Sequence, residues 1–314
     1  MLPIKIDIPE HYLKEEERDG YVVSSKMKKV WAIQLDLLAE FQRVCNEYGL
    51  SYFADSGTLL GAVRHGGYIP WDDDIDIVMP RKDYDKLVTI GQRVFTEPYF
   101  FQNAYSDMFV RPFSRLRNSQ TLALIKNDLR SSCNKGIFID VFPIDGVPIH
   151  FSKKSMQLRR IMIATEIMRI GMTSKSSYYS SIIKKVNCIA CNELFRHLDY
   201  KDYMKHIEKM IKKLGKDNSE LVSNIALSMG NPKSIWPKEV FDSYKIVPFE
   251  FLTIRIPSNY IKRLIVEYGQ NYMIPVKTST AHGTCIFEPN IPYKQYLQEH
   301  SINEIIKILG GDTR

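Results

Sequence analysis

The stretch Trp71-Asp72-Asp73-Asp74-Ile75-Asp76-Ile77 places four carboxylates within five positions and then continues directly into further apolar residues. An acidic turn at a protein surface is ordinarily followed by polar residues, so this run instead indicates like charges that enter a β-strand. Residues two apart in a strand face the same side, which would put Asp74 and Asp76 on one face and the isoleucines on the other. Such an arrangement is unfavourable unless a cation lies among the carboxylates.

The chemistry of these carboxylates predicts a divalent metal site. Mg²⁺ or a similar ion such as Mn²⁺ binds one or two carboxylates together with phosphate oxygens and water. We therefore expect Asp74 and Asp76 to be metal ligands and catalytic residues. Asp140 is the expected third ligand, because it is the single charge within the apolar run 137–142. The alternatives are a solvated acidic turn for the first pair and a solvent-facing strand end for Asp140. Asp145 is expected in a turn, or at most beside a ligand.

The segment before the acidic run predicts a phosphate-binding helix start. Ser56-Gly57-Thr58 is expected to open a helix that is capped by Asp55 or Ser56 and terminated by Gly66-Gly67. Backbone N–H groups and the helix dipole attract phosphate at such a start, and Gly57 allows a close approach. Ser56, Gly57 and Thr58 are thus predicted to bind the phosphates of a cofactor. Arg64 either reaches the same phosphates or stabilises the end of the helix as a cation.

Other polar residues leave two interpretations open. Arg117, together with Arg115, either pairs with phosphate or lies on an exposed strand face. His282 is either a donor to phosphate or a structural histidine. Cys188-x-x-Cys191 has the spacing of half a zinc site but no ordered second pair, so buried small apolar residues are expected. The basic clusters between 153 and 216 either form solvated helix faces or hold the protein at an anionic membrane.

The composition bounds the class of protein. A chain of 314 residues with 44% hydrophobic and 25% charged residues is ordinary for a soluble globular protein of one or two domains. The net charge of +7 fits an anionic substrate, an acidic membrane surface or nucleic acid. Five unevenly spaced cysteines argue against a disulfide framework and favour a reducing compartment. Neither a secretory signal nor an uncharged run of ~18 residues is present. We expect a cytoplasmic protein with, at most, peripheral contact to the inner membrane face.

Hydrophobic periodicity predicts alternating helices and strands. We expect an N-terminal arm over 1–20, one catalytic domain over 21–300 and a C-terminal tail over 301–314. Residues 152–217 show little strand signal and are expected to be a basic, helical insertion in that domain. The expected helices cover about 24–48, 58–65, 82–94, 257–268 and 293–308, and the expected strands cover 50–54, 74–79, two segments within 109–125, and 136–142.

These motifs resemble a known family. A strand, a Ser-Gly-Thr turn into a helix and an Asp-x-Asp strand resemble the nucleotidyltransferase superfamily, which includes DNA polymerase β. Within it, residues 57–65 and 70–77, followed by Arg81-x-x-Tyr84, closely resemble the LicD family, the choline-phosphate transferases of bacterial surface glycans. Residues 138–146 are similar to the second motif of that family. Tyr268-Gly269-x-x-Tyr272-x-x-Pro275 with His282 is similar to its C-terminal motif.

The resemblance implies an α+β fold of the nucleotidyltransferase (DNA polymerase β-like) type, with a small mixed sheet, flanking helices and an added helical segment. It implies a CDP-linked alcohol donor, such as CDP-choline, CDP-glycerol or CDP-ribitol, bound through Mg²⁺ or Mn²⁺ on Asp74, Asp76 and Asp140. A sugar hydroxyl of a glycan or lipid-linked glycan would attack the distal phosphorus and release CMP. Asp140 would also accept the proton of that hydroxyl. Lipopolysaccharide, capsule and teichoic acid are the acceptor classes that the resemblance suggests, and nucleic acid is not expected as a partner.

Two other functions stay open at this point. The first is a nucleotidyltransferase that uses the same metal site to move a nucleoside monophosphate to a small molecule or glycan. The second is a basic membrane-binding or nucleic-acid-binding module without enzymatic activity. The module accounts for the net charge but leaves the carboxylates on apolar strands without a reason.

Overall fold

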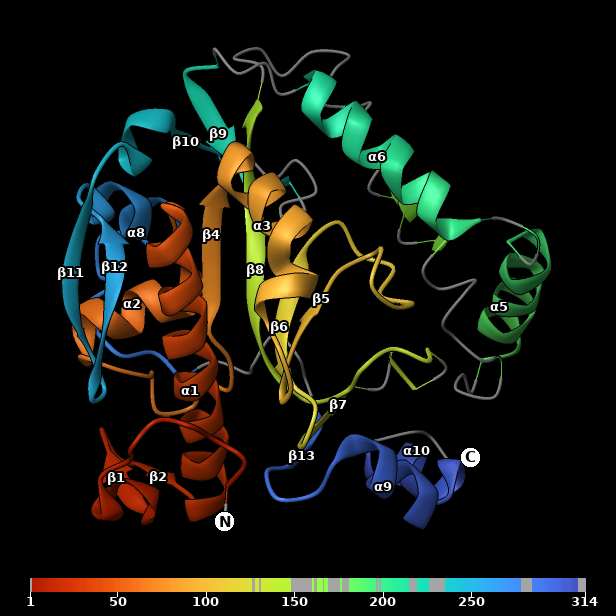
Figure 1. Ribbon diagram of the computed structural model, residues 1–314, viewed down its shortest axis with the longest axis horizontal. Coiled ribbons are helices and arrows are strands. Elements are labelled where there is room, and N and C mark those ends of the chain that lie inside the picture. The colour runs from red at the N-terminus through yellow and green to blue at the C-terminus, as the bar shows by residue number, and fades with distance from the viewer. Residues whose placement is uncertain are drawn as a thin grey trace.

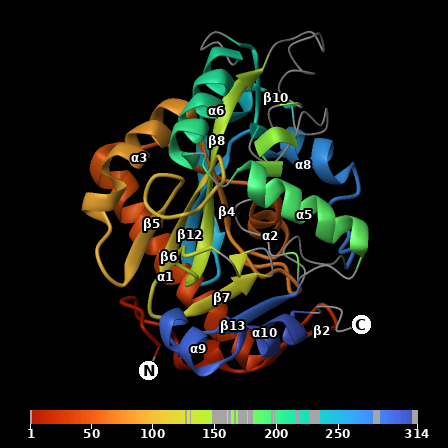
Figure 2. The ribbon, with the colours of Figure 1, turned by 90° about the vertical axis from the view of Figure 1, so that its right-hand side faces the viewer.

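The structure is a computed structural model with a mixed α+β architecture, in which helices flank a central mixed sheet (Figures 1 and 2). The architecture agrees with the expected class of a small mixed sheet with flanking helices. The residues that the structure describes are 2–125, 128–129, 131–147, 160, 163–165, 167–168, 176, 181–195, 197, 199–214, 219–225, 235–277 and 284–309.

The central sheet has seven strands and is organised around β8 (Ile137–Val147). β4 (Asp76–Pro80) pairs with β8 in parallel, and its register sets Asp76 directly opposite Asp140. β3 (Phe53–Ala54) pairs antiparallel with β4. The other strands of the sheet pair antiparallel in the orders β8–β6–β5 and β8–β9–β10, with bounds Tyr99–Gln102 (β5), Ser114–Asn118 (β6), Leu221–Ser223 (β9) and Ile235–Pro237 (β10).

The long helix α1 (Ser25–Tyr48) covers the sheet, as Figure 1 shows. The Ser24 side chain accepts a hydrogen bond from the Met27 N–H at its start, and Gly49, with φ of 61°, ends it in the left-handed region. Its apolar stripe, which includes Trp31 and Phe41, lies in the main core with residues of β4 and β8. The helix expected over 24–48 is confirmed.

Two short strands lead into the helices that the sequence predicts next. α2 (Ser56–Arg64) follows β3, and α3 (Arg81–Val94) follows β4. Gly61 lies where α2 meets the following loop. A Cβ at this position would lie 2.4 Å from the backbone oxygen of Gly67, so a larger residue would push backbone against backbone.

Two expected strands have different ends in the structure. The strand expected over 74–79 begins at Asp76, where the pairing of β4 with β8 begins. The strand expected over 136–142 continues to Val147, since its second half pairs with β4 and then with β9. Asp145 therefore lies within a strand and not in a turn. Its carboxylate accepts two hydrogen bonds of 2.6 Å from the Arg81 guanidinium.

Long-range pairing separates the two strands that were expected within 109–125. β6 joins the central sheet, whereas β7 (Leu122–Ile125) pairs antiparallel with β13 (Cys285–Glu288). The helix expected over 293–308 is divided at Ser301, whose side chain starts a new helix through a capping box with Glu304. Its two parts are α9 (Tyr293–Glu299) and α10 (Ile302–Ile308).

The N-terminal arm and the remaining elements pack around this frame. Arg18 in the arm donates hydrogen bonds of 2.6 and 2.8 Å to Glu250. Within the described part of 152–217 the regular elements are helices, as the lack of strand signal predicts, whereas the insertion itself stays a prediction. None of the described helices is both long and apolar enough to cross a bilayer. The remaining elements are η1 (Glu10–Leu13), β1 (Glu16–Arg18), β2 (Tyr21–Val23), α5 (Ile182–Leu194), α6 (Tyr200–Leu214), η5 (Lys238–Phe241), β11 (Tyr244–Phe249), β12 (Leu252–Pro257) and α8 (Tyr260–Tyr268).

The close approach at Gly61 gives a test of this packing. We expect Gly61→Ala to lower the free energy of unfolding by about 1–3 kcal/mol, because the added methyl group meets the Gly67 carbonyl and cannot rotate away. Urea unfolding measures the change. Gly66→Ala is the matched control: Gly66 has φ of 64° but open space around it, so only backbone strain of about 1 kcal/mol is expected. A cost at Gly61 no larger than that at Gly66 would contradict the described contact.

Candidate active site

Three carboxylates that are far apart in the sequence meet at the start of β4. Oxygen atoms of Asp74, Asp76 and Asp140 all lie within 4.8 Å of one another. Asp76 and Asp140 are neighbours because β4 and β8 pair in parallel, and Asp74 lies two residues before the strand. Asp140 is buried and the other two are half-buried. The acidic run is therefore not a solvated turn, and Asp140 is not at a solvent-facing strand end.

Two side chains of α1 donate hydrogen bonds to the main chain of the acidic run. The Trp31 indole donates a hydrogen bond of 3.1 Å to the Asp72 carbonyl, and the Gln34 amide donates one of 2.8 Å to the Asp73 carbonyl. Tyr68 donates to the Gln34 amide oxygen at 3.1 Å and stacks on Trp31 with ring centroids 4.4 Å apart. These neutral contacts fix the acidic run without adding charge to it.

Residues at the start of α2 also contact the acidic run. The Thr58 hydroxyl accepts a hydrogen bond of 2.8 Å from the Asp76 N–H. A Cβ at Gly57 would lie 2.4 Å from a carboxylate oxygen of Asp72, so glycine leaves room for that carboxylate. Ser56 adopts a φ of 47°, in the left-handed region. The structure thus brings Gly57 and Thr58 to the acidic run, and the phosphate contacts predicted for Ser56, Gly57 and Thr58 stay a prediction.

Asp55 precedes α2 but does not cap it through its side chain. Its carboxylate instead accepts hydrogen bonds of 2.7 and 2.9 Å from Arg263 of α8, and both side chains are buried. The Arg263 guanidinium also lies 4.0 Å from the ring centroid of Trp236. No local pattern predicts this ion pair, because its partners are 208 positions apart in the sequence.

The clustered carboxylates repel one another. Burial, followed by the nearby charges of Asp74 and Asp140, raises the pKa of Asp76 well above its ordinary value. Burial and the neighbouring Asp73 raise the pKa of Asp72 to about 6. Protein groups alone therefore leave the negative charge at this site incompletely compensated.

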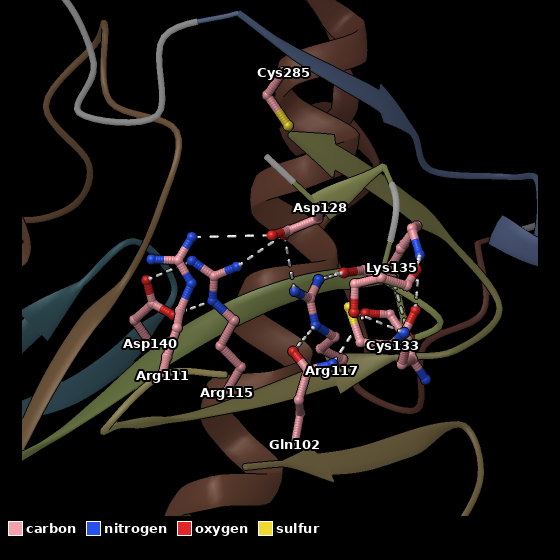
Figure 3. Close-up of polar contacts among 12 residues, drawn as sticks. Gln102, Arg111, Arg115, Arg117, Asp128, Cys133, Lys135, Asp140 and Cys285 are labelled. Carbon is pink, nitrogen blue, oxygen red and sulfur yellow. Dashed lines mark hydrogen bonds and ion pairs between the residues drawn. The ribbon is translucent and has the colours of Figure 1, made fainter. Parts of the chain in front are cut away.

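Arg115 provides the cationic contact of Asp140. Its guanidinium donates hydrogen bonds of 2.5 and 3.2 Å to the two carboxylate oxygens and also lies 3.8 Å from an oxygen of Asp128 (Figure 3). Arg111 and Arg117 lie 3.9 and 4.0 Å from Asp128, so three guanidinium groups converge on one carboxylate. No pattern in the sequence distinguishes Asp128, so the sequence does not predict its place among these arginines.

Arg117 occupies a position unlike either interpretation offered by the sequence. It is 0% exposed and donates hydrogen bonds of 2.6 Å to the Gln102 side chain and to the Gly136 carbonyl. Burial, followed by the charge of Arg115, lowers the pKa of Arg117 to about 10. Neither Arg115 nor Arg117 lies on an exposed strand face. These contacts make Arg117 a buried structural residue and give no support to the predicted phosphate contact.

Two other predicted binding residues lie apart from the carboxylates or outside the described chain. Arg64 is at the opposite end of α2 from Ser56, about 12 Å along the axis at 1.5 Å per residue. Its guanidinium donates hydrogen bonds to the carbonyls of Tyr272 and Ile274, so it holds that loop. His282 lies outside the described residues, and its predicted role stays a prediction.

The cysteine pair does not form a metal site among the described residues. Cys188 is buried and Cys191 half-buried on α5. The groups of potential metal ligands found in the described ranges are carboxylate groups alone, namely the run Asp72–Asp74 and the trio of Asp74, Asp76 and Asp140. An all-oxygen donor set suits a hard cation such as Mg²⁺ and does not suit zinc bound through thiolates. The uncompensated charge and the close approach of three carboxylates fit such an ion.

Comparisons with known proteins agree with this geometry. The family model described as LicD/FKTN/FKRP, nucleotidyltransferase domain, matches residues 49–163. The lipopolysaccharide cholinephosphotransferase LicD of Haemophilus influenzae is 24% identical over 249 residues, which cover 77% of this chain and 89% of that protein. An uncharacterized protein of Rickettsia prowazekii is 31% identical over 140 residues, 44% of this chain and 48% of its own length. The matched region contains α2, the acidic run and Asp140, so the part of the chain that forms the candidate site is similar to the LicD family.

Proposed function

We propose that this protein is a metal-dependent phosphotransferase with a nucleotidyltransferase fold. It would move a phospho-alcohol, such as phosphocholine, glycerol phosphate or ribitol phosphate, from a CDP-activated donor to a sugar hydroxyl of a cell-surface glycan. The observation that carries the proposal is the meeting of Asp74, Asp76 and Asp140 beside the start of α2. The similarity to a lipopolysaccharide cholinephosphotransferase supports the choice of reaction.

Asp74, Asp76 and Asp140 would hold Mg²⁺ or Mn²⁺, which when bound neutralises charge on the diphosphate of the donor. Ser56, Gly57 and Thr58 place the N-terminal end of α2 at the same point, where it can orient a phosphate. Phosphoryl transfer depends on positioning and charge stabilisation more than on covalent participation of the protein. A rigid site of this composition suits that requirement.

Asp140 is the residue that we propose to accept the proton of the attacking hydroxyl. The bond from the acceptor oxygen to the distal phosphorus forms while the bond from that phosphorus to CMP breaks. Arg115 fixes the orientation of the Asp140 carboxylate through two hydrogen bonds. Each carboxylate oxygen can accept a further bond, so the contact with Arg115 leaves capacity for a substrate.

The matched family description favours one alternative, the transfer of a nucleoside monophosphate by the same site. Incubation with a panel of CDP-choline, CDP-glycerol, CDP-ribitol, CTP and ATP, with Mg²⁺ or Mn²⁺ and a glycan acceptor, distinguishes the two. Release of CMP from a CDP-alcohol supports the proposal. Release of pyrophosphate from a triphosphate, without CMP release from any CDP-alcohol, would replace it with the alternative.

Removal of the carboxylates tests their role in the reaction. We expect Asp74→Asn and Asp76→Asn each to lower kcat for CMP release at least about 100-fold, because each variant loses an anionic ligand of the cation that would neutralise the donor diphosphate. Asp202→Asn is the matched control, since Asp202 is an exposed carboxylate on α6. Full CMP release by an Asp74→Asn, Asp76→Asn double variant would show that these carboxylates do not carry the reaction.

The repulsion among the carboxylates predicts a gain in stability when one charge is removed. The fold raises the pKa of Asp76. Well below pH ~4 this carboxyl group is protonated in both the folded and the unfolded chain, so it does not lower the free energy of unfolding. As the pH rises above ~4, the carboxyl group ionises more readily in the unfolded chain, and the free energy of unfolding falls. We expect Asp76→Asn to raise the Tm of the metal-free protein by at least roughly 2 °C, the effect of about 1 kcal/mol in a domain of this size. The gain should be larger at pH 8 than at pH 5. Differential scanning calorimetry in a chelating buffer measures it.

A buried carboxylate that is already paired provides the control for this stability experiment. Asp145→Asn weakens the ion pair with Arg81 and should lower the Tm. Added Mg²⁺ should raise the Tm of the wild type and of Asp145→Asn, but not that of Asp76→Asn. A lower Tm for metal-free Asp76→Asn than for the wild type would show that the three carboxylates do not repel one another as described.

A further inference from the structure

Among the described residues, helix α5 presents an exposed apolar stripe. At 100° per residue, its five most exposed large apolar side chains fall within an arc of about 140°. Cys188, on the other side of the helix, is 2% exposed and marks the face that contacts the protein. The side chains of this stripe are Ile182 (77% exposed), Ile183 (73%), Val186 (58%), Ile189 (51%) and Leu194 (73%).

The orientation of α5 is the reverse of that expected for a helix on a globular domain. Such a helix ordinarily turns its apolar stripe toward the core and its polar face toward solvent. α5 instead turns its apolar stripe away from the body of the protein. In Figure 1 it lies at the right-hand edge of the molecule, away from the central sheet, and Figure 2 shows the same edge from the front. Exposure of a contiguous stripe of this size indicates a surface that binds an apolar partner.

The charge of the surrounding segment indicates what kind of partner this is. Residues 152–217 contain 15 Lys and Arg against 6 Asp and Glu, so the segment carries a net charge of +9 and the other 248 residues carry −2. The excess positive charge of the protein is thus confined to the segment that contains α5. Lys184 and Lys185 are exposed on α5 itself, beside the apolar stripe.

We propose that α5 docks the protein on the surface of an anionic lipid bilayer. The apolar stripe would enter the boundary between headgroups and acyl chains, and the lysines would contact lipid phosphates. A helix of 13 residues is too short to span a bilayer but is long enough to lie in its surface. A second copy of the chain fits less well, because two segments of charge +9 repel each other, whereas anionic lipid attracts them.

Docking through α5 also suggests which acceptor the protein uses. This step of the inference, unlike the docking itself, rests on the proposed function. A glycan that is built on a lipid carrier is confined to the bilayer surface. An enzyme held at that surface through α5 meets this acceptor in two dimensions, at a higher effective concentration than in solution. The acceptor class that the surface suggests is therefore a lipid-linked glycan.

Vesicle binding tests the docking surface directly. The full chain is mixed with sucrose-loaded vesicles of phosphatidylcholine alone or of phosphatidylcholine with phosphatidylglycerol, and the bound fraction is measured after centrifugation. We expect binding to the anionic vesicles and weaker binding as NaCl is raised, because salt screens the lysines. Binding is measured without donor or acceptor, so its outcome does not depend on catalysis.

A pair of matched variants shows whether α5 is the contact. We expect Ile182→Ser with Ile183→Ser to lower the partition coefficient on anionic vesicles at least about tenfold, because two buried side chains are lost from the lipid. Val22→Ser with Ile246→Ser removes two apolar residues of similar exposure (57% and 62%) on other elements and should leave binding unchanged. Far-UV circular dichroism verifies that both proteins are folded.

Three outcomes would overturn the proposal. The first is a wild-type chain that does not bind anionic vesicles, and the second is an α5 variant that binds them as well as the wild type does. The third is a wild-type dimer, measured by light scattering, that the α5 variant converts to a monomer, since the stripe would then be an interface between copies. CMP release with a water-soluble acceptor should be equal for the α5 variant and the wild type. If CMP release is absent from both proteins, the proposed function is wrong. Vesicle binding still decides whether α5 is a docking surface.

Discussion

The site depends on how the protein holds Asp72–Asp76, a run in which like charges repel one another. The main chain of this run is fixed by neutral groups: the Trp31 indole, the Gln34 amide and the Thr58 hydroxyl. These contacts bind main-chain atoms and leave the carboxylate oxygens to one another and to a ligand. The packing of α1 on the sheet and the start of α2 beside β4 both serve to place these neutral groups. A fold that lost either contact would let the charged segment relax into solvent.

Two buried arginines complete the surroundings of the site. Arg263 binds Asp55 immediately before α2, and Arg115 binds Asp140 on β8. Both ion pairs have two hydrogen bonds, the geometry in which a buried charge is best satisfied. They place one guanidinium on Asp140, a member of the carboxylate trio, and another on Asp55, next to the start of α2. The protein thereby limits the electrostatic cost of the site while keeping it competent for a cation.

The sequence predicted those parts of the structure that depend on local pattern. The apolar run after Asp74 and the apolar residues around Asp140 predicted two strands, and the carboxylates within them suggested the candidate ligands. The parallel pairing that makes Asp76 and Asp140 neighbours is a property of the whole sheet, and no local pattern predicts it. The exposed strand face was wrong for Arg117, because period-two alternation shows which residues share a face but not that both faces of a central strand are buried.

The direct register of Asp76 with Asp140 has a consequence for any study that refolds this protein. A slip of one residue between β4 and β8 would turn one carboxylate to the other face of the sheet and expose apolar residues at the same time. Native-like helix content would survive such an error, and so would much of the spectroscopic signature of a folded chain. The approach of Asp76 to Asp140 would not survive it, and neither would the metal-dependent turnover proposed above. An assay of that turnover would therefore also report strand alignment, which bulk optical methods overlook.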